Sequence, residues 1–499
     1  MVLDILEELK RSEEKRPLLI QLRERLRGAE GAKERMRLLE ELEQTEAVLL
    51  GLFASEDAKV RKNLALILGE LAVPKHRQLL WEKYLLEETR FVRGAYLEAL
   101  KHFDIKELAK ELKAELARLQ EIELNDENRK HLAEEKTLLR ELLQRVEAEK
   151  PHRFTGKGIV SDLILTTNRN HKHVVIEELG MRKKKAFAAG VMVQTEDPAA
   201  LYELRTFEEL FFVLPGCFQV AEDPVQAAEQ LAKAGIYSYL KRRHEENGRP
   251  FVFRIELRGD MPLEKRSAFT KKMAAALEEQ TKGGLVNLVS GYEVELRMVQ
   301  SKERGWYVMI KLLTLKDHRF AYRRRTISAG IRPVNAALCM ALAEEYLTEN
   351  ARCLDPFCGT GTMLVERAKK KKVKELYGTD ILEEAVLGAR ENTKLAGVDA
   401  NFIHRDFLTF THEQQFDEII TDMPFVTLEA KEKQKELEQL YRSFFDKAPE
   451  HLKPNGIMIL YTHDRPLAKR YAAGKFVLEK EYELSMREGS YLYILKSVK

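Results

Sequence analysis

Hydrophobic residues recur at helical spacing from the start of the chain to about residue 150. Residues with a high helix propensity dominate this stretch, and Gly and Pro are sparse in it. Apolar positions three and four residues apart lie on one face of a helix, so the pattern favours helices that pack through an apolar stripe. We therefore predict an all-α N-terminal domain over residues 1–150.

Two helical segments of this region resemble each other. Residues 60–68 line up with residues 92–100 at an offset of 32 residues, which is typical of one helix pair. The pattern resembles a HEAT-like repeat, in which helix pairs stack into a solenoid. Further along, an apolar stripe at helical spacing is formed by Leu108, Leu112, Leu116 and Leu119. We interpret the domain as a helical scaffold; the alternative is a docking surface for RNA or a protein partner.

The period changes to two after Pro151 and the turn-forming run 156–158. Over residues 155–315, alternation of apolar and polar residues predicts strands at 162–167, 251–258, 292–297 and 305–310. Helical spacing predicts helices at 174–179 and 263–279. This mixed order indicates an α+β region and not a second doubly wound sheet.

From about residue 320 to the end, predicted strands and helices alternate. Residues 457–460 form a late strand after a Pro-Asn-Gly turn, and residues 490–495 form the last strand. Alternation of this kind predicts a doubly wound α/β domain over residues 320–499. The whole chain is therefore expected to be multidomain.

A strand, an acid and a Gly-x-Gly turn stand in succession near the start of this last domain. Asp355 ends an apolar strand, Gly359 and Gly361 form the turn, and a helix begins directly after it. Glycine lets the backbone approach a ligand and adopt angles that a side chain forbids. A dinucleotide-binding turn would place a third glycine at position 364, where this chain has leucine. The order is the one that a class I methyltransferase uses to hold S-adenosylmethionine.

Three more acids follow, and two of them, Asp380 and Asp422, end predicted strands. Asp380 is placed to accept hydrogen bonds from both ribose hydroxyls, and Asp406 to accept one from the adenine amino group. Asp422 ends another strand and is followed by Met423-Pro424-Phe425. Ligands of open α/β sheets bind at the carboxyl ends of the strands, where these acids are expected. The alternative is an unrelated doubly wound domain that carries acids at its strand ends.

The amino-acid composition limits the kinds of partner that the protein is expected to have. The chain has 499 residues, 44% of them hydrophobic and 33% charged, which is typical of a globular protein of about three domains. We expect no membrane association, because the apolar runs are too short to span a bilayer. The four cysteines have no metal-binding spacing and suit the reducing cytosol, so we expect a cytoplasmic protein without a metal. Four basic clusters favour a nucleic-acid partner: 182–185, 241–243, 323–325 and 369–372.

Three separated matches give the chain a resemblance to the THUMP-domain RNA methyltransferases, especially those that methylate guanosine N2 in tRNA or rRNA. Residues 166–179 resemble the opening strand and helix of the family's ferredoxin-like and THUMP region. Residues 322–325, running into the Arg-Pro helix at 331–338, resemble its basic lead-in, and the series 355–425 resembles its catalytic domain. The resemblance covers about residues 155–499 and leaves the helical segment outside.

The resemblance implies a ferredoxin-like and THUMP-like RNA-binding region at 155–315 and a Rossmann-like, seven-stranded methyltransferase domain that closes with an antiparallel hairpin. It also implies RNA as partner, with tRNA first and rRNA second. Nothing in the sequence specifies the oligomeric state. The implied S-adenosylmethionine contacts are Asp355, Pro356, Phe357, Cys358, Gly359, Gly361, Asp380, Ile381, Asp406, Phe407 and Pro333.

Within that set each position has an expected role. Asp355 and the glycine backbone face the methionine end of the cofactor, and Ile381 lies against the adenine ring. Phe407 lies beside the adenine, and Pro333 covers the cofactor. For Asp380 the alternative role is a helix N-cap, and for Asp406 it is a surface turn.

The catalytic segment implied by the resemblance is Asp422, Met423, Pro424 and Phe425. Asp422 and the carbonyl of Met423 would accept hydrogen bonds from the amine, and Phe425 would stack on a flipped base or, alternatively, pack under the sheet edge. The family usually has Pro-Pro after the acid. Met423 stands at the first of these positions, so the backbone there lacks the fixed φ angle of proline. Another departure is Asn170-His171-Lys172 in place of Gly-Leu-Glu.

Two other functions stay open at this level. One is an RNA- or ribosome-binding protein with a degenerate methyltransferase domain, which Met423 favours and the three intact acids oppose. The other is methylation of a different amine, such as adenine N6 or a protein side chain, because the Asp-x-Pro-Phe segment does not itself name the base.

Overall fold

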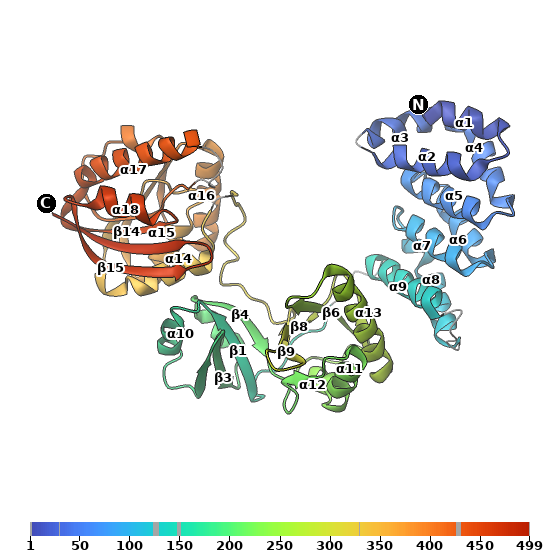
Figure 1. The fold of residues 1–499 in the computed structure, drawn as a ribbon, viewed down its shortest axis with the longest axis horizontal. Coiled ribbons are helices and arrows are strands. Elements are labelled where there is room, and N and C mark those ends of the chain that lie inside the picture. The colour runs from blue at the N-terminus through green and yellow to red at the C-terminus, as the bar shows by residue number, and fades with distance from the viewer. Residues whose placement is uncertain are drawn as a thin grey trace. The chain divides into compact units, whose positions relative to one another are not determined.

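The computed structural model describes residues 2–28, 30–122, 129–146, 151–328, 330–425 and 431–498 (Figure 1). Contacts group the chain into two compact units. One comprises Met1–Pro151 with Leu288–Gly291, and the other comprises His152–Asn287 with Tyr292–Lys499.

The first unit is helical throughout its described residues. Aliphatic side chains from successive helices form one core, as the helical spacing predicts. The repeat is visible in the burial pattern, because Val60 and Leu64 of one helix correspond to the buried Val92 and Tyr96 of another. The helices are α1 Val2–Arg11, α2 Lys15–Arg27, α3 Gly31–Glu40, α4 Leu42–Gly51, η1 Leu52–Ala54, α5 Ala58–Leu71, α6 His76–Leu86, α7 Arg90–Leu100, η2 Lys106–Leu108, α8 Ala109–Gln120 and α9 Arg129–Val146.

A buried polar cluster joins four of these helices. Arg93 of α7 donates to Glu115 of α8 at 2.8 Å and to Glu135 of α9 at 2.6 Å. The hydroxyl of Tyr84 on α6 donates to Glu135 at 2.7 Å. A buried charge that loses its partner is strongly destabilising, so the cluster favours one packing arrangement of these helices.

The central region forms one mixed sheet with helices, in agreement with the predicted α+β order. Among the described residues the sheet has nine strands in the order β2-β3-β1-β4-β9-β8-β6-β7, with β5 paired to β9. A single residue pair, Phe212 with Ile310, joins β4 to β9 and so connects the two halves of the sheet. The elements are β1 Ser161–Thr167, α10 Lys172–Glu178, β2 Lys184–Phe187, β3 Gly190–Thr195, η3 Ala199–Glu203, β4 Phe207–Phe212, β5 Gln219–Val220, α11 Pro224–Lys233, α12 Ile236–Lys241, β6 Phe251–Arg258, α13 Leu263–Gln280, β7 Leu285–Asn287, β8 Val294–Gln300 and β9 Trp306–Leu312.

The C-terminal region contains the predicted seven-stranded sheet, in the order β12-β11-β10-β13-β14-β16-β15 among the described residues. Strands β10 to β14 run parallel, and β16 pairs antiparallel with both β14 and β15, which confirms the closing hairpin. The elements are α14 Pro333–Leu342, η4 Glu344–Tyr346, β10 Ala351–Asp355, α15 Thr362–Lys370, β11 Val373–Asp380, α16 Glu383–Ala396, β12 Asn401–His404, η5 Phe407–Thr409, β13 Phe416–Asp422, α17 Lys431–His451, β14 Leu452–Thr462, α18 Arg465–Ala472, β15 Phe476–Ser485 and β16 Ser490–Ser497.

A fully buried ion pair holds the helix after the glycine turn against the sheet. Arg367 of α15 donates to both carboxylate oxygens of Glu418 on β13, at 2.6 and 3.0 Å, and both side chains are 0% exposed. Its remaining donors reach the carbonyls of Thr348 and Lys371. The pair therefore fixes the last turn of α15 relative to β13.

The sequence departure at 170–172 has a structural use. Asn170 donates to the carbonyl of Glu483 on β15 at 3.0 Å, and Nε2 of His171 lies 2.9 Å from the same oxygen. Asn168 donates to the carbonyl of Leu484 at 2.8 Å. The loop between β1 and α10 thus hydrogen-bonds to the backbone of the C-terminal sheet.

Candidate active site

The acid that ends β10 lies at the centre of the candidate site. Asp355 is 1% exposed, and its Oδ1 accepts hydrogen bonds from the Thr421 hydroxyl at 2.8 Å and from the Phe357 N–H at 3.2 Å. Burial raises the pKa of Asp355 to about 7; these two hydrogen bonds oppose the rise, and the charge of Asp380 adds to it. A carboxyl of this kind favours a nearby cation, which would stabilise its ionised form.

The turn after Asp355 requires its glycines. Gly359 has φ +49° and Gly361 has φ +80°, in the left-handed region that side chains rarely adopt. A Cβ on Gly361 would lie 3.3 Å from atoms of Ala389 and Phe402, so the turn is packed tightly on its inner side. Cys358 and Pro356 are buried and hydrogen-bond to β11, through the backbone and side chain of Thr379.

Asp380 joins the second strand to this turn. Its Oδ2 accepts from the Gly359 N–H at 2.9 Å, and its Oδ1 accepts from the Leu382 N–H at 2.9 Å. Leu382 precedes the first residue of α16, so Asp380 is not the N-cap residue of that helix. Each carboxylate oxygen has a second lone pair, so Asp380 keeps acceptor capacity for hydroxyl groups. Ile381 beside it is 66% exposed.

The two predicted adenine contacts, Asp406 and Phe407, differ in their exposure to solvent. Asp406 is exposed, and its Oδ1 accepts from the Leu408 N–H at 2.9 Å in a tight turn. The ring of Phe407 is buried against Phe357 and Phe444. Any contact of Phe407 with a cofactor would therefore be indirect, through Phe357, which is only half-buried.

Asp422 at the end of β13 has an unused acceptor. Its Oδ1 is buried and has no hydrogen-bond partner among the described residues. The pKa of Asp422 is raised to about 8, mainly by burial and also by the nearby Asp355, while a hydrogen bond from the Ile331 backbone opposes the rise. A buried polar atom without a partner is costly, and such atoms are common where a ligand supplies the missing contact.

Met423 is held by a hydrogen bond where the resembled family has a proline. Its N–H donates to the carbonyl of Tyr461 on β14 at 2.9 Å, and its side chain is 1% exposed. Proline has no N–H and could not make this bond. The expected loss of rigidity at Met423 is therefore offset by a contact that the sequence did not reveal.

The two residues after Met423 are exposed. Phe425 is 39% exposed, and its ring centroid lies 4.5 Å from that of His463, which follows β14. Phe425 therefore does not pack under the sheet edge; its ring stays accessible beside a second ring.

Several residues that shape the site were not predicted from the sequence. Asn392 of α16 accepts from the backbone N–H groups of Arg324 and Arg325, both at 3.0 Å, and donates to the carbonyl of Thr360 at 3.1 Å. It thereby fixes the basic lead-in beside the glycine turn. A buried asparagine inside an otherwise apolar helix face was the available signal. Thr421 and Tyr461 act through contacts across the sheet, for which the sequence holds no signal.

Pro333 begins α14, and it is half-buried at the first helical position, where proline is favoured. Among the described residues, no group of three or more His, Cys, Asp or Glu side chains is arranged to hold a metal ion. Over the same residues, no helix is both long and apolar enough to cross a membrane.

Comparison with known proteins agrees with this geometry. Residues 321–493 match the methyltransferase domain of the RMKL-like family. The chain is 32% identical over 226 residues to a tRNA (guanine(10)-N2)-dimethyltransferase of Methanothermobacter thermautotrophicus, covering 42% of this chain and 64% of that protein. It is 36% identical over 101 residues to the U6 snRNA (guanine-N(2))-methyltransferase THUMPD2 of Mus musculus, covering 20% and 19% of the two chains.

A solved structure of TrmN from Thermus thermophilus is similar in fold. The two chains have 22% sequence identity and a TM-score of 0.52, over 67% of this chain and 99% of the other. The chain spans less than two thirds of the length of these curated relatives. The matched C-terminal region is thus similar to the methyltransferase domain of the RMKL-like family, and the chain shares its fold with TrmN.

Proposed function

We propose that this protein transfers a methyl group from S-adenosylmethionine to the exocyclic N2 of a guanosine in RNA, with tRNA as the first substrate class and rRNA as the second. The observation that carries the proposal is the unpartnered Oδ1 of Asp422, which is buried at the head of the Asp422–Phe425 segment. The two guanine-N2 methyltransferases to which the chain is similar support the choice of atom.

The residues around the glycine turn fit the cofactor. The Gly359–Gly361 turn provides a close backbone approach, Asp355 offers a buried carboxyl to the cationic methionine end, and Asp380 offers acceptors to the ribose. Asp406 and the exposed Ile381 lie at the ends of neighbouring strands, where the adenine would be held. When bound, the cofactor supplies the electrophilic methyl group.

The chain's own residues orient the amine. The N2 lone pair of guanosine is delocalised into the ring, so it attacks poorly unless it is localised. Asp422 and the carbonyl of Met423 accept hydrogen bonds from the two N–H groups, which aims the lone pair at the methyl group. Transfer of the methyl group would leave the amine with one proton too many, which a residue of the site has to accept. The ionised form of Asp422 accepts this proton, and because burial raises the pKa of Asp422 to about 8, that form becomes more abundant as the pH rises towards 8.

The other regions have supporting roles in this proposal. The central sheet with α10 to α13 is a ferredoxin-like and THUMP-like RNA-binding region, and the helical unit is a HEAT-like scaffold. The four cysteines are free and buried, which is compatible with a cytoplasmic site of action. Phe425, which is accessible beside His463, provides a ring on which an unstacked base would lie.

The degenerate-domain hypothesis loses its main support. It rested on Met423, and the Met423 N–H is bonded to β14 in a way that a proline would abolish. Methylation of a different amine remains the second candidate, because the acceptors of Asp422 and Met423 recognise any N–H₂ group.

The test is methyl transfer from labelled S-adenosylmethionine to unmodified tRNA and rRNA, followed by nucleoside analysis. Label in N2-methylguanosine is the expected result, and Asp422→Asn serves as a control that retains cofactor binding. Label in N6-methyladenosine would show that the methylated atom is adenine N6 and not guanine N2. Label in neither pool, with cofactor binding intact, would refute an RNA substrate.

A further inference from the structure

The four basic clusters of the chain differ in how far their charges are neutralised. In three of them at least one cation is paired with a carboxylate: Lys241 with Glu246 at 3.0 Å, Arg325 with Glu391 at 2.7 Å, and Lys370 with Glu344 at 2.7 Å. These clusters therefore contribute partly to holding the fold. The remaining cluster is Arg182–Lys185.

The Arg182–Lys185 cluster has no carboxylate partner within the described part of the chain. Arg182 donates to the carbonyl of Leu179 at 3.2 Å, and Lys184 donates to the carbonyl of Gly180. Lys183 and Lys185 are exposed. Four consecutive cations without a neutralising acid produce a local positive potential that attracts anions.

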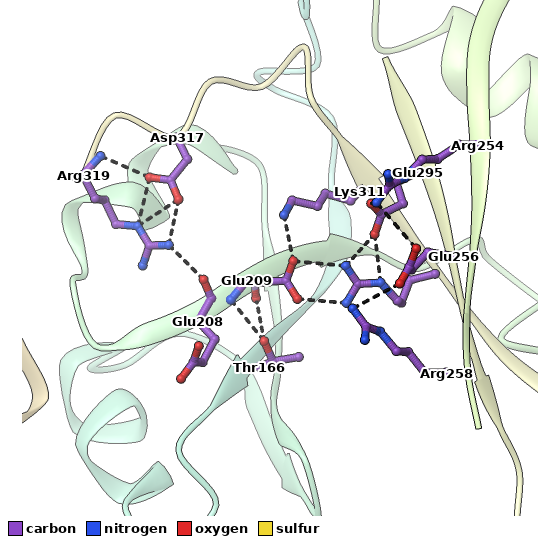
Figure 2. Close-up of polar contacts among 11 residues, drawn as sticks. Thr166, Glu208, Glu209, Arg254, Glu256, Arg258, Glu295, Lys311, Asp317 and Arg319 are labelled. Carbon is purple, nitrogen blue, oxygen red and sulfur yellow. Dashed lines mark hydrogen bonds and ion pairs between the residues drawn. The ribbon is translucent and has the colours of Figure 1, made fainter. Parts of the chain in front are cut away.

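The open face of the same sheet shows the opposite arrangement (Figure 2). There Glu209 of β4 accepts from Lys311 of β9 at 2.7 Å and from Arg297 of β8 at 2.9 Å. Arg254 of β6 pairs with Glu295 of β8 at 2.9 Å. The positive charges of Arg254, Arg297 and Lys311 are thus matched with acids, in contrast to those of the Arg182–Lys185 cluster.

The cluster runs into an edge strand: Arg182 and Lys183 precede β2, and Lys184 and Lys185 are its first two residues. Strand β2 pairs with β3 and with no other described strand, in the register Lys184 with Val193 and Lys185 with Met192. Its outer edge therefore presents backbone groups and basic side chains to solvent. Lysine on an edge strand also prevents pairing with strands of other molecules. Protection of the edge is therefore a structural explanation for these lysines, and the experiment below separates it from ligand binding.

One end of β2 lies close to the methyltransferase domain. The carbonyl of Phe187, the last residue of β2, accepts from Lys172 at 2.8 Å. Lys172 directly follows His171, whose Nε2 lies 2.9 Å from the Glu483 carbonyl of β15. Four strand residues span roughly 13 Å, so the basic cluster begins within about that distance of the loop that touches the C-terminal sheet. Arg169 of this loop is also exposed.

We propose that the basic edge strand Arg182–Lys185, continued by Arg169, binds the phosphodiester backbone of the RNA substrate next to the methyltransferase domain. This inference rests on the proposed function, since it assumes an RNA substrate. The occupant is RNA because the cluster consists of consecutive cations without a carboxylate partner among the described residues, which a row of phosphates complements. In this proposal the cluster positions the RNA, and other residues recognise the base.

The experiment compares two double variants of the full-length protein on an unmodified tRNA transcript. In Lys183→Glu/Lys185→Glu the edge strand stays charged, so its protection against strand pairing is kept. The matched control is Lys394→Glu/Lys480→Glu, which makes the same change in net charge at two exposed positions outside the central region, on α16 and β15. RNA affinity is measured at several salt concentrations, together with kcat, KM and S-adenosylmethionine affinity.

We expect the edge-strand variant to raise the Kd and KM for RNA by at least about tenfold at 0.1 M salt. The slope of log Kd against log salt concentration should fall by the equivalent of about two released ions. Its kcat at saturating RNA and its cofactor affinity should equal those of the wild type, and the Lys394→Glu/Lys480→Glu variant should stay within about twofold in Kd.

Equal RNA affinities for the wild type and the edge-strand variant would overturn the inference while leaving the proposed function intact. Equal losses in both variants would also overturn it, by showing an effect of net charge alone. Aggregation of Lys183→Gln/Lys185→Gln with unchanged RNA affinity would assign the lysines to edge protection. Absence of RNA binding by the wild type would instead refute the proposed function.

Discussion

Asp355 should make cofactor binding release a proton, and Asp355→Asn should abolish that release. Burial raises the pKa of Asp355 to about 7 in the free protein, so the carboxyl is protonated below that pH. The cofactor is cationic, and a cation favours the ionised carboxylate. Binding should therefore lower the pKa, release a proton and become tighter as the pH rises towards 7 and beyond.

The magnitude follows from a contact between opposite charges. At ~4 Å and an effective dielectric constant of ~20, the attraction is about 4 kcal/mol. That energy corresponds to about three pKa units, so the pKa in the complex should be about 4. Binding should then release about 0.9 proton at pH 6, about half a proton at pH 7 and almost none at pH 8.5, and the Kd should rise about tenfold from pH 8.5 to pH 6.

Titration calorimetry in buffers of different protonation enthalpy measures both quantities. Asp355→Asn retains an acceptor for the Thr421 hydroxyl at Oδ1, so its fold should be preserved while its Kd becomes independent of pH. Asp422 is the other acid of the site whose pKa is raised, and the two charges interact, so Asp422→Asn is the control that removes the other titration. A wild-type Kd that is constant between pH 6 and 8.5, without proton release, would refute the reasoning.

Three further outcomes are expected. Asp422→Asn should leave S-adenosylmethionine affinity within about threefold and slow methyl transfer by about a hundredfold or more, measured in single-turnover experiments; loss of cofactor affinity instead would assign Asp422 to the cofactor. Met423→Pro should lower the stability of the domain by about 1–3 kcal/mol and reduce activity, because the Tyr461 carbonyl loses its donor; a more active variant in thermal-shift and transfer assays would contradict this. Glu418→Gln should destabilise the domain by about 3–5 kcal/mol by leaving Arg367 buried without its countercharge, and unchanged thermal unfolding would disprove that dependence.

Much of the fold follows from local patterns. Helical spacing predicts the helices of the first unit, and alternation predicts β6 over 251–258 with the bounds that the structure has. The strand ends Asp355, Asp380 and Asp422 were also predicted correctly, because an acid after an apolar run and before a turn is a short-range pattern. The seven-stranded order follows from the fold class.

Contacts between distant residues could not be predicted in this way. Thr421 bonds to Asp355 across two parallel strands, and Asn392 joins α16 to the lead-in at Arg324. The Met423 N–H meets the carbonyl of Tyr461 on another strand. Each partner lies tens of residues away along the chain, so no local spacing records the pair.

The sequence by itself determined the elements, the acids at the strand ends and the glycine turn, because each depends on neighbouring residues only. The tertiary structure decided which acids are buried and how their pKa values shift, because desolvation depends on everything packed around a side chain. It also decided which basic clusters are neutralised. Lys370 and Lys185 stand in similar lysine runs, and only the folded chain brings a carboxylate to one of them and leaves the other exposed.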